Sequence, residues 1–238
     1  MSAADSVDER VQIVEDIIGN RFSCRAYLDK QVPHETITRI VETAQKSASW
    51  CNSQAWQLHL TQGAGTERFR TALSTHAAEM MGDRALPLVS PDIPMPAEYV
   101  GVYSERRRAC GLQLYETIGV IRGDRVASAQ AMLKNFSFFG APHVAVITTP
   151  VSLGTYGVLD CGLFVSTFLT VAQSHGLGTI AQGAIAVYSA FVREYFEVPE
   201  DRNILCGISF GYPDMSAPIN NFRTQRAPVE DVVQWIDA

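Results

Sequence analysis

Apolar residues recur along this chain with the periods of both helices and strands. From Val7 to Ile18 they are spaced alternately by four and three residues, which predicts a helix that ends at Gly19-Asn20. A second stripe of the same kind spans residues 37–44 and predicts another helix. Residues 56–61 alternate between apolar and polar side chains, the pattern of a strand that is buried on one face.

The second half of the chain holds longer apolar runs. Residues 144–147 predict a central strand, and residues 179–181 and 204–210 predict two more. Residues 159–172 are apolar almost all round, which is typical of a helix that is buried in a large core or at a subunit interface. Further helices are expected around residues 69–73, 112–119 and 126–133.

The order of these elements indicates the fold class. The predicted strands lie too far apart in the sequence for hairpins, and they do not alternate strictly with helices. We therefore predict an α+β fold in which a central mixed sheet is covered by helices. No repeat or linker-like stretch marks a boundary, so residues 1–238 are expected to form a single domain.

Composition and charge exclude several classes of protein. A net charge of −6 argues against a nucleic-acid partner. The polar N-terminal stretch does not resemble a signal peptide, and no apolar run approaches the roughly 18 residues of a membrane span. Five scattered cysteines without a Cys-x-x-Cys motif favour free thiols in a reducing cytoplasm and offer no zinc site. The five histidines form no metal-like pair and are expected at the surface or at helix ends.

One stretch interrupts the regular pattern. Residues 84–103 contain four prolines, which exclude a regular helix or a central strand over most of that length. A long irregular insert in a compact domain is often a lid or a binding loop, and the alternative is a rigid surface excursion. The sequence does not distinguish these two interpretations.

The chain carries a candidate phosphate site directly after the first predicted helix. If residues 21–25 are extended, the side chains of Arg21, Ser23 and Arg25 point to one side, and those of Phe22 and Cys24 point to the other. Two guanidinium groups with a hydroxyl group between them suit a phosphate, because arginine offers a planar fork of donors. The alternative is a solvated polar edge.

Three other segments are candidates for ligand binding. Residues 47–56 join a helix to a strand and are dense in small hydrogen-bonding side chains that suit a planar polar ring. Glycines in residues 176–184 permit close approach of the backbone to a ligand. A second arginine pair, Arg223 and Arg226, follows near the C-terminus. Each segment also has an ordinary structural explanation, but together they suggest a phosphorylated aromatic cofactor.

Two segments resemble known motifs but lack the neighbouring residues that those motifs require. Gly207-Ile-Ser209-Phe-Gly211 has the spacing of a hydrolase nucleophile elbow, but Tyr212-Pro213 follows at once and every histidine precedes Ser209. The glycine-rich stretch 176–183 lacks the Gly-x-Gly-x-x-Gly spacing of a dinucleotide fingerprint. We therefore predict neither a serine hydrolase nor a Rossmann fold.

The ordered series of motifs resembles the nitroreductase family of flavin enzymes, from about Val11 to Trp235. The segments that carry the resemblance are Arg21-Phe-Ser-Cys-Arg25, Ser49-Trp-Cys-Asn52-Ser-Gln54-Ala-Trp56, Phe138-Phe-Gly-Ala-Pro142, Gly176-Leu-Gly178-Thr-Ile-Ala-Gln182-Gly183, Pro199-Glu-Asp201, Gly207-Ile-Ser-Phe-Gly211-Tyr-Pro-Asp214 and Arg223-Thr-Gln-Arg226-Ala-Pro228. The segment Ser104-Glu-Arg-Arg-Arg108 looks most like the branch that reduces nitrobenzoate-type compounds.

The resemblance implies an intertwined homodimer with FMN at the subunit interface. It implies that Arg21, Ser23 and Arg226 hold the phosphate, that Arg25 lies nearer the flavin pyrimidine, and that the backbone of Gln182 or Gly183 meets flavin N5. Loop residues Ser49, Asn52 and Gln54 would approach from the partner subunit. The full implied cofactor-binding set is Arg21, Phe22, Ser23, Arg25, Ser49, Asn52, Gln54, Arg107, Gln182, Gly183, Arg223 and Arg226.

The chain departs from the family pattern at two positions in the loop. Ala48 and Ala55 stand where the family often has proline, which should loosen the loop around Asn52. Cys24 and Cys51 lie inside the motifs, and we interpret both as small apolar fillers rather than redox groups.

The implied activity is two-electron, ping-pong transfer of hydride from NADH or NADPH through FMN to nitroaromatic or quinone-like acceptors. The cofactor carries such chemistry, so no side-chain nucleophile or metal is required. Alternatives on the same fold are reductive dehalogenation, enal reduction and flavin fragmentation. A flavin store or sensor with little turnover is an alternative of another class. The sequence reveals neither the acceptor nor the preferred nicotinamide.

Overall fold

The computed structural model describes residues 3–82 and 89–236. Its α-helices are α1 (Ala3–Asn20), α2 (His34–Ala44), α3 (Ala64–Gly82), α4 (Gly101–Thr117), α5 (Arg125–Leu133), α6 (Gly154–Ser174), α7 (Gly183–Ala186) and α8 (Ser189–Phe196). Its strands are β1 (Gln57–Thr61), β2 (His143–Pro150), β3 (Gly178–Gln182) and β4 (Arg202–Gly211). Short 3-10 turns are η1 (Trp50–Asn52), η2 (Phe138–Gly140), η3 (Val151–Leu153), η4 (Pro218–Asn221) and η5 (Val229–Asp231).

The four strands form one sheet in the order β1-β2-β4-β3, and each neighbouring pair is antiparallel. The parallel part of the predicted mixed sheet is limited to a bridge between Ser23 and Thr179, where the Cys24 N–H donates to the Thr179 carbonyl oxygen at 2.9 Å. This bridge joins the arginine segment to the edge of the sheet.

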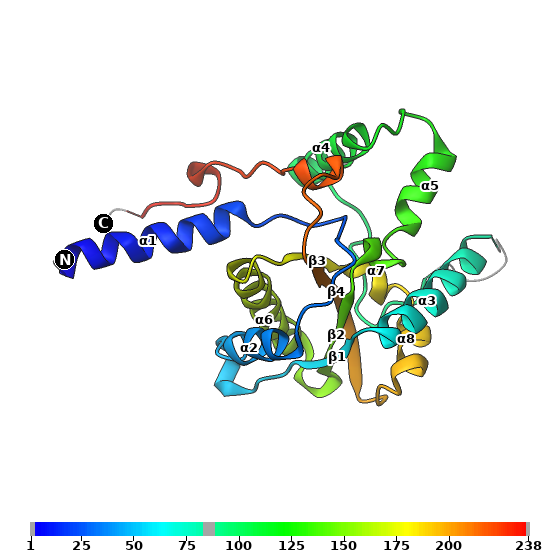
Figure 1. Ribbon diagram of the computed structural model, residues 1–238, viewed down its shortest axis with the longest axis horizontal. Helices are drawn as coiled ribbons and strands as arrows, with labels where there is room; N and C mark the ends of the chain where they lie inside the picture. Colours follow the sequence, from blue (N-terminus) through cyan, green and yellow to red (C-terminus); the bar gives the residue numbers. More distant parts are fainter. Residues whose placement is uncertain (1–2, 83–88, 237–238) are drawn as a thin grey trace.

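Helices cover both faces of the sheet, which confirms the predicted α+β fold (Figure 1). On β2, Ala145 and Ile147 face a core that includes α2 and α6, whereas Val144 and Val146 face a core that includes α3, α7 and α8. Because both faces are covered, all four residues are fully buried, and β2 reads as a continuous apolar run.

Helix α6 packs with one side on the sheet and leaves the other side exposed. Phe164 and Phe168 are fully buried, whereas Leu159 is 57% exposed and Leu163 is 44% exposed. Of the two predicted surroundings for this helix, complete burial in the core of one protomer is wrong, and burial at a subunit interface stays a prediction. The segment Val151–Ser174 is also long and apolar enough to cross a membrane by length and composition, which corrects the expectation that no run approaches that length. Of its most apolar window, 33% is buried in the protomer, where α6 packs on the sheet.

Three helices lie away from the sheet. Helix α1 projects from the body of the protein, and the final segment of the chain runs beside it (Figure 1). Its apolar stripe is exposed, at 47% for Val7 and 56% for Ile18. Helices α4 and α5, all of whose residues the structure describes, contain no buried residue. A single protomer thus leaves several apolar helix surfaces uncovered.

The proline-rich insert is fastened at Asp92. Its carboxylate lies 2.6 Å from the Arg193 guanidinium and accepts from the Ile204 N–H at 2.8 Å, while the Asp92 N–H donates to Ser189 Oγ at 3.1 Å. Residues 83–88 of the predicted 84–103 insert lie outside the described residues, and residues from Gly101 onward belong to α4. Asp92 thus connects the insert to α8 and β4.

Candidate functional site

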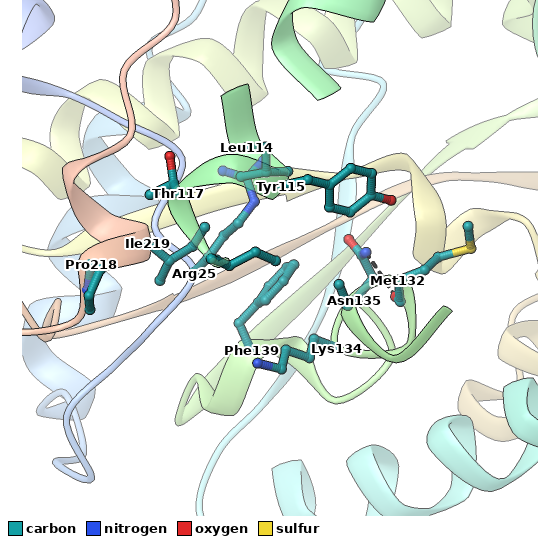
Figure 2. Close-up of a pocket in the computed structure, with 12 residues that line it drawn as sticks. Arg25, Leu114, Tyr115, Thr117, Met132, Lys134, Asn135, Phe139, Pro218 and Ile219 are labelled. Atoms are coloured by element: carbon teal, nitrogen blue, oxygen red, sulfur yellow. Dashed lines mark hydrogen bonds between the residues drawn. The ribbon is translucent and has the colours of Figure 1, made fainter. Parts of the chain in front are cut away.

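A cavity of about 530 Å³ lies between α4, α5, η2 and η4. Figure 2 shows Arg25, Phe139 and Ile219 around it, each from a different segment of the chain. The other lining residues are mostly apolar, with a few polar side chains among them. The apolar ones are Leu114, Ile118, Ala131, Met132 and Pro218, and those with a polar group are Tyr115, Thr117, Lys134 and Asn135. The mixture of an apolar wall with a few polar groups suits a planar aromatic ligand.

A second cavity, also of about 530 Å³, is lined by four arginines: Arg21, Arg25, Arg223 and Arg226. Arg25 lines both cavities and so marks the place where they meet. The remaining lining residues are Ile18, Gly19, Phe22, Ser23, Cys110, Phe222 and Thr224. The fold therefore brings together the two arginine pairs that are about 200 residues apart in the sequence.

The electrostatics of the second cavity favour an anion. Burial lowers the pKa of the Arg21 guanidinium, and the nearby positive charge of Arg226 lowers it further. Within residues 3–82 and 89–236, Arg21 has neither a hydrogen-bond acceptor nor a carboxylate partner. Two cations that face each other without an anion repel, so a phosphate dianion between them would be strongly stabilised.

The two C-terminal arginines of this cavity, Arg223 and Arg226, are held by contacts with neighbouring residues of their own segment. Arg223 donates to the carbonyl oxygens of Asn220, at 2.6 Å, and Phe222, and its guanidinium carbon lies 4.0 Å from the centroid of the Phe22 ring. Arg226 donates to Thr224 Oγ1 at 2.7 Å. These contacts use only part of each planar fork of donors, so both groups retain donors for a ligand.

Arg25 is held firmly between the two cavities. Its N–H donates to Asn220 Oδ1 at 2.8 Å, its guanidinium donates to the Ser23 carbonyl oxygen at 3.2 Å, and burial lowers its pKa. The expected alternation is confirmed for Cys24, which is fully buried away from the cavity, but is wrong for Phe22, whose ring lines the arginine cavity because Arg223 packs against it. Burial raises the pKa of the Cys24 thiol, which agrees with its interpretation as a filler.

Asn135 is a lining residue that sequence reasoning missed. Its carbonyl oxygen accepts from Gln182 Nε2 at 2.9 Å, and the Gln182 amide oxygen accepts a short hydrogen bond from Ser209 Oγ. This relay connects β4 and β3 with the first cavity. Asn135 lies three residues before the Phe138–Pro142 motif, and only the structure identifies it as part of the site, through its place in the cavity wall and its contact with Gln182. Gly183 follows Gln182 at the start of α7 and does not line either cavity.

The loop residues Ser49, Asn52 and Gln54 do not line either cavity of the same protomer. They lie around η1, next to α6, and Asn52 and Gln54 are exposed. Asn52, Cys51 and Gln54 have left-handed φ angles of 55°, 51° and 48°. One protomer thus assembles the arginine half of the predicted site and leaves the loop half apart from it.

Two further sequence predictions have different outcomes. Arg107 lies on the exposed side of α4, with its guanidinium carbon 5.1 Å from the centroid of the Tyr99 ring and outside both cavities. Its role at the cofactor stays a prediction. The expectation that every histidine lies at the surface or at a helix end is wrong for His143, which is buried in β2. Its Nε2 accepts from the Val32 N–H at 3.0 Å.

Comparison with known proteins yields one consistent group. The sequence model of the nitroreductase family matches residues 18–212. The nitroreductase NfnB of Mycolicibacterium smegmatis is 31% identical over 225 residues, with 94% of this chain and 93% of that protein covered. The 4-nitrobenzoate reductase of Pseudomonas putida is 29% identical and covers 88% of this chain and 89% of its own length.

The solved structures agree with these sequence matches. The crystal structure of the FMN-dependent nitroreductase NfnB from Mycobacterium smegmatis in complex with NADPH superposes with a TM-score of 0.88 at 31% identity. It covers 95% of this chain and 99% of that one. The residues that the family model matches include the first arginine segment, the loop and all four strands.

Proposed function

The chain belongs to the nitroreductase family, and we propose that it is an FMN-dependent oxidoreductase that passes two electrons from NADH or NADPH to electron-poor aromatic or quinone-like acceptors. One observation carries the proposal. The arginine cavity and the apolar cavity meet at Arg25, which matches a ligand with a phosphate at one end and an aromatic ring at the other.

The arginine cavity is the proposed phosphate site. Arg21, Arg226 and Ser23 would hold the phosphate, with Arg223 beside them. The repulsion between Arg21 and Arg226 would be relieved by the bound dianion. This electrostatic gain is specific to a phosphorylated ligand, so riboflavin should bind much more weakly than FMN.

The apolar cavity is the proposed ring site. Phe139 and Leu114 supply apolar surface, and Asn135 supplies amide groups that suit the polar edge of a flavin. FMN, when bound, supplies the hydride chemistry at N5, and the protein supplies position and electrostatics. Arg25 would stabilise negative charge on the pyrimidine end of the reduced ring. The backbone at Gln182 and Gly183 is the proposed neighbour of N5.

A second copy of the chain would complete the site. The exposed apolar residues of α1 and α6 are suited to pack against another protomer, which would explain why α6 is apolar all round. In that homodimer the loop with Ser49, Asn52 and Gln54 would reach the cofactor of the partner subunit. The loop is unconnected to either cavity of its own protomer, which supports this arrangement.

Nicotinamide and acceptor would use the same open face of the ring in turn. We therefore expect ping-pong kinetics, in which initial-rate lines at several acceptor concentrations are parallel. Lines that intersect would show that donor and acceptor bind together and would contradict a single shared place. Relatives that reduce 4-nitrobenzoate make nitroaromatic compounds the first acceptors to test.

The deciding experiment is the visible absorbance spectrum of the purified protein, followed by anaerobic addition of NADPH and then NADH. An FMN spectrum that bleaches rapidly, and that returns when a nitroaromatic acceptor is added, supports the proposed function. A bound flavin that resists both donors contradicts an NAD(P)H reductase and favours a flavin store or sensor. A protein that takes up no FMN contradicts the site assignment.

A further inference from the structure

The loop around Asn52 has a conformation that its own residues do not favour. Cys51, Asn52 and Gln54 all have backbone φ angles near +50°, a region that residues other than glycine adopt uncommonly. Such backbone persists only where neighbouring groups impose it. Neither Ala48 nor Ala55 restricts the chain as proline would, so the constraint must come from elsewhere.

Hydrogen bonds within the loop close it but do not fix its direction. The N–H groups of Asn52 and Ser53 donate to the carbonyl oxygens of Ser49 and Trp50, each at 3.0 Å. The Gln54 N–H donates to Ser49 Oγ at 3.1 Å. All these contacts join residues of the same short segment, so they would move with the loop as a unit.

The Asp160 carboxylate ties the loop to the sheet-packed helix α6. Its Oδ1 accepts from the Trp50 N–H at 3.0 Å, and its Oδ2 accepts from Ser53 Oγ at 2.7 Å. The two oxygens therefore hold the residues on either side of Cys51 and Asn52. The exposed ring of Trp50 adds a contact with Tyr156 of the same helix, with ring centroids 4.9 Å apart.

Asp160 is an unusual residue for its place in the core. It is 3% exposed, and among residues 3–82 and 89–236 no cation forms an ion pair with it. A buried carboxylate is costly unless its oxygens accept hydrogen bonds, and both of its side-chain bonds go to the loop. An apolar side chain in place of Asp160 would pack α6 against its neighbours equally well.

We propose that Asp160 is a positioning residue for the cofactor site, whose carboxylate holds the loop so that Asn52 and Gln54 are presented to FMN on the partner subunit. This inference rests on the proposed function, because it takes FMN as the ligand and a second copy as its holder. Asp160 touches neither cofactor nor substrate and acts only through the loop.

The test compares FMN dissociation constants of four proteins, measured by fluorescence titration of the apoproteins. Asp160→Asn removes the charge from both hydrogen bonds, and we expect binding about tenfold weaker than in the wild type. Ser53→Ala removes one bond, and we expect a loss of about threefold in the same direction. Asp92→Asn is the matched control, since Asp92 is a second poorly exposed aspartate whose contacts lie outside both cavities. It should lower the melting temperature and leave FMN affinity unchanged.

A double-mutant cycle separates positioning from general destabilisation. If Asp160 acts through the loop, Asn52→Ala and Asp160→Asn together weaken FMN binding by much less than the product of the single effects. Multiplicative effects would overturn the proposal, as would unchanged affinity in Asp160→Asn, or an Asp160→Asn protein that loses FMN because it no longer dimerises in sedimentation runs. A wild-type protein without FMN affinity overturns the proposed function as well, so the two failures are distinguishable.

Discussion

The two halves of the proposed site differ in how they are held. The arginine half is assembled within one protomer, where Arg21 and Arg226 come together from opposite ends of the chain around a cavity of about 530 Å³. The loop half is exposed and stands apart, with its direction set by Asp160. The comparison indicates that the proposed phosphate and ring cavities are both formed within a single chain, whereas the proposed contact of the loop with the ring depends on association of two chains.

The largest expected effect is on the arginine half. Arg21→Ala removes the guanidinium group that faces Arg226, and we expect FMN affinity to fall by about a hundredfold, so that the protein purifies nearly colourless. Arg39→Ala, on the exposed side of α2, is the control and should retain FMN. The ratio of visible flavin absorbance to ultraviolet protein absorbance measures occupancy. Full occupancy in Arg21→Ala would refute the phosphate assignment.

Complementation between two defective chains tests whether the halves come from different subunits. One chain carries Arg21→Ala, and the other carries alanine at Ser49, Asn52 and Gln54. Random mixing of the two chains by refolding should restore about a quarter of the sites, because half of the dimers are mixed and each has one intact site. NADPH-dependent reduction of a nitroaromatic compound measures the recovery. No recovery, in dimers shown to be mixed, would mean that both halves serve the same subunit.

A smaller effect is expected from inorganic phosphate, which tests whether the arginine half binds an anion without the loop half. Because the arginine half is already formed in one protomer, phosphate alone should raise the melting temperature of the apoprotein by a few degrees, about what 1 kcal/mol of ligand binding supplies. Arg21→Ala should abolish the shift, and the triple alanine loop variant should retain it. A shift that disappears in the loop variant would show that the two halves are not independent.

The smallest expected effect is on the stability of the protein and concerns His143, which is buried in β2. Burial lowers the pKa of His143 below its unfolded value of about 6.5, so the unfolded state takes up its proton first as the pH falls. The contribution of neutral His143 to the free energy of unfolding is therefore fully present above about pH 6.5. Below that pH the free energy of unfolding decreases, by at most about 1.4 kcal/mol per pH unit for one proton. Because His143 accepts from the Val32 N–H, protonation would loosen the segment that leads into α2.

Urea unfolding at about pH 7, 6 and 5 measures this dependence. His59, whose pKa is also lowered by burial and by Arg202, adds to the slope in the same direction. His143→Gln should be less stable at neutral pH and should show a shallower slope. A free energy of unfolding that does not change over this range would contradict the neutral, buried state of His143.

Sequence reasoning succeeded where the physical cause is local. The helix at residues 126–133 and the strand at residues 144–147 follow from apolar period alone, and the structure has α5 and β2 there. Alternation over residues 21–25 correctly separated the arginines from the buried Cys24 but wrongly placed Phe22, which lines the arginine cavity. Sequence reasoning failed for His143, because burial of a histidine depends on hydrogen-bond donors and acceptors that distant segments supply.

The sequence by itself determined the α+β class, the family and the arginine segments, because apolar period, turn residues and motif spacing are properties of neighbouring residues. Only the tertiary structure decided that Arg21 faces Arg226, that Asn135 lines the ring cavity, and that Asp160 lies beneath the loop. Each of these contacts joins segments that are distant in sequence. Strand order and helix packing set them, and no local pattern of side chains encodes either one.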